Sequence, residues 1–190
     1  MTKHNSLIKP TTGVGTIVFD LETNGLLNDA TRIHCVAIHD IESGQTETFN
    51  DESPGKGMSS PITRAITTIE MADTIIGHNI VSFDLPIIKK LYHFFSPVGR
   101  IVDTLLLSRL YHPNLLEIDK KRCWNHMPLQ LYGRHSLEAY GYRLSEYKGN
   151  FGKTADWSKW SQEMEDYCVQ DVVVTNKLCN HFLPYLNGSR

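Results

Sequence analysis

Acidic side chains stand at three places along the chain with spacings that suit metal chemistry. Asp20 and Glu22 lie two residues apart at the end of the apolar run 16–21. In a strand they would project from one face, roughly 7 Å apart at the backbone, and would repel each other unless a cation lay between them. A divalent metal bound through carboxylate oxygens is the natural cation. A solvated acidic pair at the end of a strand is the alternative.

The second acid is Asp84, which ends the segment 78–84 between a short apolar run and a helical pattern. It is placed either to bind a metal or to cap the N-terminus of the helix. The third is Asp171, which shares one face of a predicted C-terminal helix with Tyr167, four residues earlier. A charge beside the apolar run 172–174 needs a partner or a ligand. Tyr167 also fits a core aromatic with a hydrogen-bonded hydroxyl.

The elements that must position these acids follow from the spacing of apolar residues. Strands are predicted at residues 16–21, 32–39, 45–49, 74–77 and 100–103. Helices are predicted at 61–71, 85–95, 104–111, 135–142 and 158–184, the last as one helix or two abutting ones closed by Pro184. Residues 112–134 show no clear period. An antiparallel start followed by strand–helix alternation predicts an α/β fold with a mixed sheet flanked by helices.

Length and composition narrow the class of protein. The 190 residues suit one domain, assigned to residues 15–190 after a flexible lead-in at 1–14. The four cysteines are scattered, which argues against a structural zinc site or a disulfide framework and favours a reducing cytoplasm. No apolar run is long enough to cross a bilayer, so no membrane is expected among the partners. The net charge of −2 argues against a long basic groove for duplex DNA.

The acids fall within motifs whose order is specific. The motifs resemble the three exonuclease motifs of the DEDD superfamily, in its tyrosine-containing branch: Asp20-Leu-Glu22, His78-Asn-x-x-x-Phe-Asp84 and Tyr167-x-x-x-Asp171. Segments 102–109, 135–143 and 166–175 are similar to the proofreading domain of phage-type family A DNA polymerases. The resemblance spans roughly residues 15–184 and implies a ribonuclease H-like five-stranded mixed sheet, with the acids converging at one edge.

The resemblance also implies a set of metal ligands. Asp20, Glu22 and Asp171 would hold one divalent metal. Asp20 would bridge to a second metal, whose shell Asp84 supports directly or through water. Oxygen ligands suit Mg²⁺ or Mn²⁺. Two such ions activate a water and stabilise the leaving oxygen of a phosphodiester, while Tyr167 would orient the attacking water because a phenol is a poor base at neutral pH.

The activity implied by the resemblance is that of a free-standing 3′→5′ exonuclease. It would remove nucleoside 5′-monophosphates from the 3′ end of single-stranded DNA, in the cytoplasm of a bacterium or a phage-infected host cell. Two alternatives remain open. The domain is either the proofreading subunit of a separate DNA polymerase or an exoribonuclease that uses the same metals.

Substrate contacts are expected at four residues near the motifs. Leu26 would wedge against the terminal base, although a leucine after a strand is equally suited to core packing. Phe83 would face the nucleotide or the core, and His78 and Asn79 complete this set.

Other polar residues have two readings each. Asp103 is either a helix cap or an acid that supports the site. The run 120–122 is a solvated charge cluster or a contact to the DNA backbone. His34, His39 and His135 are structural or surface residues.

Overall fold

The computed structural model describes residues 14–52, 61–122, 124, 126–146 and 156–189. The expected lead-in at residues 1–14 therefore lies outside the described residues except for Val14, and Cys123 lies outside them as well. Among the described residues, no helix is both long enough and apolar enough to span a membrane.

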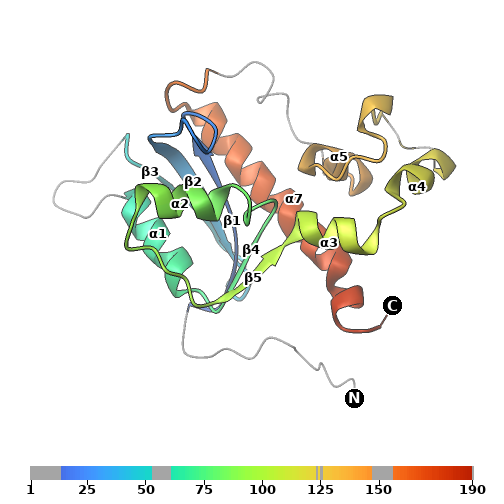
Figure 1. The fold of residues 1–190 in the computed structure, drawn as a ribbon, viewed down its shortest axis with the longest axis horizontal. Helices are drawn as coiled ribbons and strands as arrows, with labels where there is room; N and C mark the ends of the chain where they lie inside the picture. Colours follow the sequence, from blue (N-terminus) through green and yellow to red (C-terminus); the bar gives the residue numbers. More distant parts are fainter. Residues whose placement is uncertain (1–13, 53–60, 123, 125, 147–155, 190) are drawn as a thin grey trace.

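A five-stranded mixed sheet forms the centre of the molecule, with strand order β3-β2-β1-β4-β5 (Figure 1). The strands are β1 (Thr16–Thr23), β2 (Ile33–Asp40), β3 (Thr46–Asn50), β4 (Thr74–Gly77) and β5 (Arg100–Asp103). β1, β2 and β3 pair as an antiparallel meander, whereas β1, β4 and β5 pair in parallel. The prediction of a mixed α/β sheet flanked by helices is confirmed.

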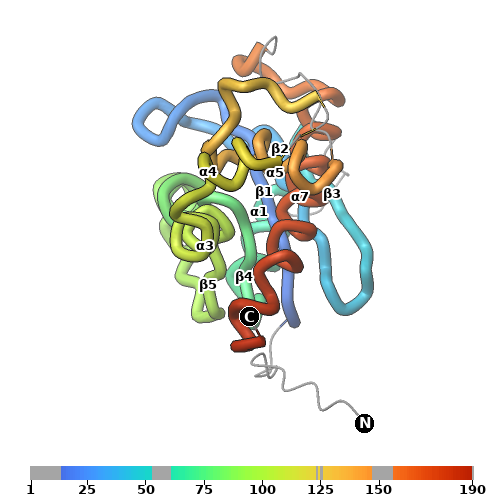
Figure 2. The backbone as a smooth tube through the Cα atoms, turned by 90° about the vertical axis from the view of Figure 1, so that its right-hand side faces the viewer, coloured from blue at the N-terminus to red at the C-terminus, as the bar shows by residue number. Residues whose placement is uncertain are grey.

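Helices cover both faces of this sheet (Figures 1 and 2). The α-helices are α1 (Pro61–Met71), α2 (Asp84–Leu91), α3 (Thr104–Tyr111), α4 (Leu115–Lys121), α5 (Leu137–Arg143) and α7 (Gln162–Leu186), and η1 is a 3₁₀ turn (Leu129–Leu131). Buried residues of α1 and α2 form one core with β1, and buried residues of α7 form a second core on the opposite face. The central strands are buried because both of their faces are covered.

The alternation along β1 decides where its acids lie. Ile17, Phe19 and Leu21 belong to the core beneath α1 and α2, whereas Val18 belongs to the core beneath α7. Successive side chains of a strand point to opposite faces. Asp20 and Glu22 therefore continue the face of Val18 and point toward α7, at the end of the strand.

Three helices differ from the prediction at their ends, and the smallest difference is in α5, which runs from Leu137 to Arg143 where a helix at 135–142 is predicted. α2 begins at Asp84 and ends at Leu91, four residues before the predicted end at Phe95. The chain turns there, and Lys89 Nζ donates to the carbonyl of Phe95 at 2.8 Å. α7 is one helix that continues past Pro184 to Leu186. A proline so close to the end of a helix removes one backbone hydrogen bond without displacing a following turn.

Residues 112–134, which gave no clear period, contain α4 and η1. These elements project with α5 from the side of the sheet, beyond α3 (Figure 1). Within residues 112–134 the helical pieces are short, since α4 has seven residues and η1 has three. This explains why no single apolar period runs through the segment.

Candidate active site

The acids of β1 meet α7 at the C-terminal end of the strand. Three ligand atoms lie within 4.8 Å of one another there: one carboxylate oxygen of Asp20, one of Glu22 and the Sγ of Cys168. Glu22 is only 9% exposed, and Asp20 is half-buried. The Cys168 thiol donates to the backbone carbonyl of Asp20 at 3.3 Å and so fixes β1 against α7.

Cys168 was missed by the sequence analysis, although it lies three residues before Asp171 on the predicted helix. Burial raises the pKa of the Cys168 thiol well above its ordinary value, and the hydrogen bond with Cys35 and the charges of Asp20 and Glu22 act in the same direction. The thiol therefore stays protonated at neutral pH. In the metal-free protein the thiol is a hydrogen-bond donor, and the carboxylate oxygens of Asp20 and Glu22 are the ligands that suit Mg²⁺ or Mn²⁺.

Asp84 is the first residue of α2 and is 4% exposed. Burial raises the pKa of Asp84 to about 7, hydrogen bonds from the backbone of Asp84 and Leu21 oppose that rise, and the charges of Asp103 and Asp171 add to it. The capping alternative is wrong, because Phe83 occupies the cap position and no side chain caps the helix. Asp84 is thus a buried acid surrounded by other acids.

Asp171 lies in the middle of α7 and is buried, and its charge reaches Asp84. Tyr167, one turn earlier on the same helix, is half-buried. The end of β1, the start of α2 and the middle of α7 lie together in the fold (Figure 1). The structure therefore brings Asp20 and Glu22 together directly, and it brings Asp84 and Asp171 within electrostatic reach of each other.

Asp103 organises the turn that precedes Asp84. Its side chain caps α3 by accepting from the first-turn amides of that helix. The same carboxylate accepts from the backbone amides of Asn79 at 2.9 Å and Val81 at 3.1 Å. Asn79 has a left-handed φ of 67°, and the ring of His78 hydrogen-bonds Thr104 at 2.9 Å. Asp103 is therefore a helix cap that also supports the site.

The loop after β1 presents Leu26 to solvent. Leu26 is 75% exposed, so the core-packing alternative for this residue is wrong. Lys90 of α2 holds the loop, because its Nζ donates at 2.8–3.0 Å to the carbonyls of Leu27, Asn28 and Ala30. Phe83, in contrast, is half-buried and packs against the core beneath α1 and α2.

A polar cleft of about 470 Å³ adjoins the turn of the second motif. His78 and Asn79 line it on one side, and Arg109, Arg134 and His135 line it on the other. Burial lowers the pKa of His135, and the neighbouring charge of Arg109 lowers it further. The two arginines were not foreseen, since only the packing of α3 beside residues 133–137 places them together.

The three histidines that the sequence indicates as structural or surface residues each form a hydrogen bond within the fold. His34 is buried, and its Nε2 lies 3.1 Å from the carbonyl oxygen of Trp157. The ring of His39 hydrogen-bonds Thr46 across the β2–β3 pair at 2.9 Å. His135 hydrogen-bonds Ser108 at 2.6 Å besides lining the cleft.

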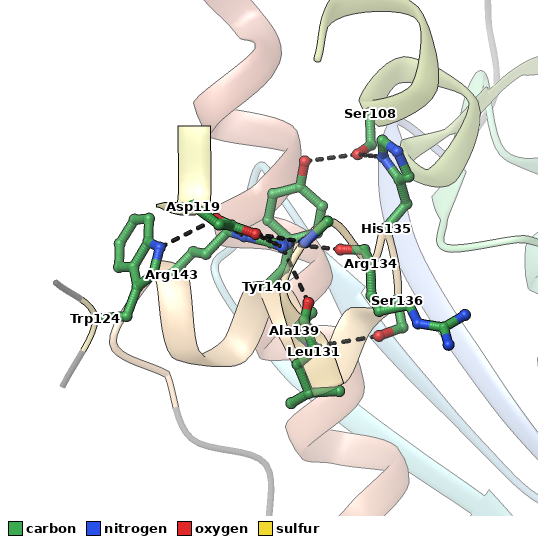
Figure 3. A network of polar contacts seen from close by, with 11 residues as sticks. Ser108, Asp119, Trp124, Leu131, Arg134, His135, Ser136, Ala139, Tyr140 and Arg143 are labelled. Carbon is green, nitrogen blue, oxygen red and sulfur yellow. Dashed lines mark hydrogen bonds and ion pairs between the residues drawn. The ribbon is translucent and has the colours of Figure 1, made fainter. Parts of the chain in front are cut away.

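A separate polar centre holds the projecting elements together (Figure 3). Arg143 of α5 donates to both oxygens of the fully buried Asp119 of α4, at 3.0 and 2.7 Å. Trp124 Nε1 and the amide of Gly133 donate to the same carboxylate, at 3.0 and 2.7 Å. Burial alone would raise the pKa of Asp119, but the hydrogen bonds from Arg143, Gly133 and Trp124 and the charge of Arg143 together lower it.

Sequence comparison matches the chain to one family model and to two phage DNA polymerases. The family model described as the RNase_H superfamily matches residues 17–183. The DNA-directed DNA polymerases of Enterobacteria phage T3 and Escherichia phage T7 are each 32% identical in an alignment of 189 positions that covers 88% of this chain and 26% of theirs. The chain thus spans about a quarter of the length of these relatives.

Structural comparison agrees on the fold. A structure described as the apo form of a nuclease covers 87% of this chain and 70% of its own, with a TM-score of 0.55 and 20% identity. Exonuclease I of E. coli, in complex with a dT13 oligonucleotide, covers 92% of this chain and 42% of its own, with a TM-score of 0.53 and 17% identity. At these identities the similarity establishes a shared architecture.

Proposed function

The chain belongs to the RNase H superfamily, and from that premise we propose that it is a metal-dependent 3′→5′ exonuclease acting on single-stranded DNA ends. One observation carries the proposal. Acids from β1, α2 and α7 gather at one end of the sheet, and among them the buried Asp84 has a pKa raised to about 7. The single exonuclease domain would comprise residues 15–190.

The acidic set fits divalent metals. Asp20, Glu22 and Asp171 would hold one ion, and Asp84 would support a second that Asp20 shares. Buried carboxylates that repel one another are stabilised by a cation, and carboxylate oxygens suit Mg²⁺ or Mn²⁺. When bound, such ions supply an activated water and stabilise charge on the leaving oxygen.

The protein's own side chains would position the substrate. The hydroxyl of Tyr167 would orient the attacking water. Leu26, held outward by the loop, would contact the terminal base, while His78, Asn79 and the exposed edge of Phe83 would border the terminal nucleotide. Arg109 and Arg134 line the adjoining cleft and suit phosphate oxygens. The product would be a nucleoside 5′-monophosphate.

Digestion of a 5′-labelled single strand tests the proposal. With Mg²⁺ or Mn²⁺ the purified protein should shorten the strand from its 3′ end one nucleotide at a time, and EDTA should stop the reaction. Asp20→Ala should be inactive, whereas Glu47→Gln, an exposed acid on β3, should be a matched active control. Full activity in EDTA or in Asp20→Ala would refute the mechanism. A matched RNA strand degraded in preference to DNA would reassign the substrate.

A second candidate function is editing for a separate DNA polymerase. The similarity to the phage T3 and T7 polymerases favours it, since those relatives are about four times as long as the matched region. Gel filtration with a polymerase from the same source would test it. Co-elution and a higher rate of mismatch removal in the mixture would support this role, and separate elution would count against it.

A further inference from the structure

A second groove lies beside α4, outside the acidic site. It encloses about 660 Å³ and is lined by Leu116, Lys120, Arg122, Trp124, Leu129 and Tyr132. Lys120 and Arg122 are exposed, and Leu129 is 79% exposed. The groove therefore presents two cations together with apolar and aromatic surface.

The aromatic part of the groove is held rigidly. Trp124 Nε1 donates to the buried Asp119, whose charge Arg143 balances (Figure 3). The guanidinium of Arg122 lies 5.4 Å from the centroid of the Trp124 ring. An arginine stacked on an indole forms a flat cationic surface, and such surfaces accept nucleic-acid bases with little preference for sequence.

The charge of this region differs from that of the whole chain. Residues 109–135 contain five arginines and lysines and only two acids, whereas the chain has a net charge of −2. One of the two acids, Asp119, is buried and paired with Arg143. The region thus attracts a polyanion although the protein as a whole does not.

The groove is adjacent in sequence to the cleft that adjoins the turn of the second motif. Tyr132 lines the groove, and the next two residues, Gly133 and Arg134, line the cleft that also contains His78 and Asn79. A strand bound in both would run from the turn of the second motif over Arg134 to α4. A single strand fits better than a duplex, because stacking on Arg122 and Trp124 requires unpaired bases.

We propose that this groove is a second binding site for the single strand, upstream of the nucleotides held at the acidic site. Lys120 and Arg122 contact phosphates, and the Arg122–Trp124 surface and Tyr132 contact bases. This inference rests on the proposed function for the direction of the strand. The groove would add contacts to nucleotides that the acidic motifs do not reach, and the enzyme would therefore prefer longer strands.

Binding without hydrolysis tests the groove separately from catalysis. In EDTA, the affinity for fluorescently labelled dT12 and dT3 is measured by polarisation at several salt concentrations. Lys120→Ala/Arg122→Ala should lower the affinity for dT12 about tenfold, lower that for dT3 much less, and reduce the dependence of log affinity on log salt by roughly 1. Arg64→Ala/Lys159→Ala removes two exposed cations outside the groove and should change the dT12 affinity less than twofold.

The outcomes separate the two proposals. Equal dT12 affinities and salt slopes in the groove variant and in its control would overturn the groove, whether or not the enzyme digests DNA. Loss of dT12 binding in the groove variant alone would support the groove, even if no hydrolysis followed when metal was added. In that second case only the exonuclease proposal would fail.

Discussion

Two buried aspartates, one before α3 in the sequence and one after it, have neighbouring charges of opposite sign. Asp84, at the end of the sheet, is 4% exposed, and burial together with the charges of Asp103 and Asp171 raises its pKa to about 7. Asp119, in the projecting elements, is fully buried, yet the hydrogen bonds and charge of Arg143 help to lower its pKa. The two carboxyl groups have similar access to water and opposite electrostatics.

The difference separates an acid whose counter-charge the fold supplies from the acid that we propose to be a metal ligand. A buried charge is tolerated when the fold itself supplies the partner, as Arg143 does for Asp119. At Asp84 the charges of Asp103 and Asp171 are of the same sign, and the backbone hydrogen bonds from Asp84 and Leu21 offset only part of the cost of burying the carboxylate. Compensation from a bound cation is the simplest resolution, and it agrees with the metal-dependent function proposed above.

The largest expected effect comes from neutralising the acid at the sheet end. Asp84→Asn should lower the rate of strand digestion by about a thousandfold, because the metal shell loses a charge. The same change should leave the free energy of unfolding unchanged or higher, since repulsion with Asp103 and Asp171 is removed. Steady-state rates and urea denaturation measure the two quantities. A variant that retains more than a tenth of the activity would contradict the assignment.

The matching change at Asp119 should have the reverse profile. Asp119→Asn leaves Arg143 buried without its counter-charge and should cost about 3–5 kcal/mol of unfolding free energy. Asp119→Leu/Arg143→Met removes both charges and should cost less than Asp119→Asn alone. Urea denaturation of the three proteins checks this order. If the double variant proved the least stable, the ion pair would not be the source of the loss.

The two acids should also give pH dependences of opposite sign. The folded state binds a proton at Asp84 more tightly than the unfolded chain, whose carboxyl has a pKa near 3.8. The unfolding free energy of the metal-free protein should therefore fall by up to a few kcal/mol as the pH rises from about 4 to 7. Asp119 has a lowered pKa, so its contribution is lost only as the pH falls below about 4.

Denaturation in EDTA between pH 5 and 8 covers the range in which Asp84 titrates and Asp119 does not, and comparison with Asp84→Asn separates the Asp84 contribution from that of histidines such as His34 and His135. The decline with pH should disappear in Asp84→Asn and persist in Asp119→Asn. Added Mg²⁺ should reduce it in the wild-type protein, since metal binds the charged carboxylates. A decline of the same size in Asp84→Asn would assign it to another group.

The smallest effect on activity is expected from Leu26, an uncharged residue in the loop after β1. Leu26→Ala should reduce kcat/KM on single-stranded DNA about threefold to tenfold, since a single apolar contact is lost. Because the side chain is 75% exposed, stability should change by less than about 0.5 kcal/mol. Thermal denaturation and initial rates measure both. A large loss of stability would mean that the loop packs differently from the arrangement described.

The elements around the acids were predictable because each has a strong local signal. Strands 74–77 and 100–103 and helices 61–71 and 104–111 have the predicted bounds. Asp20 and Glu22 lie near the end of β1 and Asp84 at the start of α2, where the periodic pattern changes, whereas Asp171 lies within α7. The capping role of Asp84 was a reasonable local alternative, but burial among other acids decides its role, and that depends on the tertiary fold.

The projecting elements were not predictable by the same reasoning. Asp119 and Arg143 are 24 residues apart, and neither position carries a periodic signal. The Arg109–Arg134 cleft likewise forms only when α3 packs beside residues 133–137. Long-range polar contacts of this kind leave no spacing rule in one sequence.

The carboxylate of Asp103 has a mechanical consequence. Because it fastens the first turn of α3 and the 79–81 turn at once, the two segments form a single joint. Because Asp103 is also the last residue of β5, this contact fixes α3 and the backbone leading into Asp84 to the edge of the sheet.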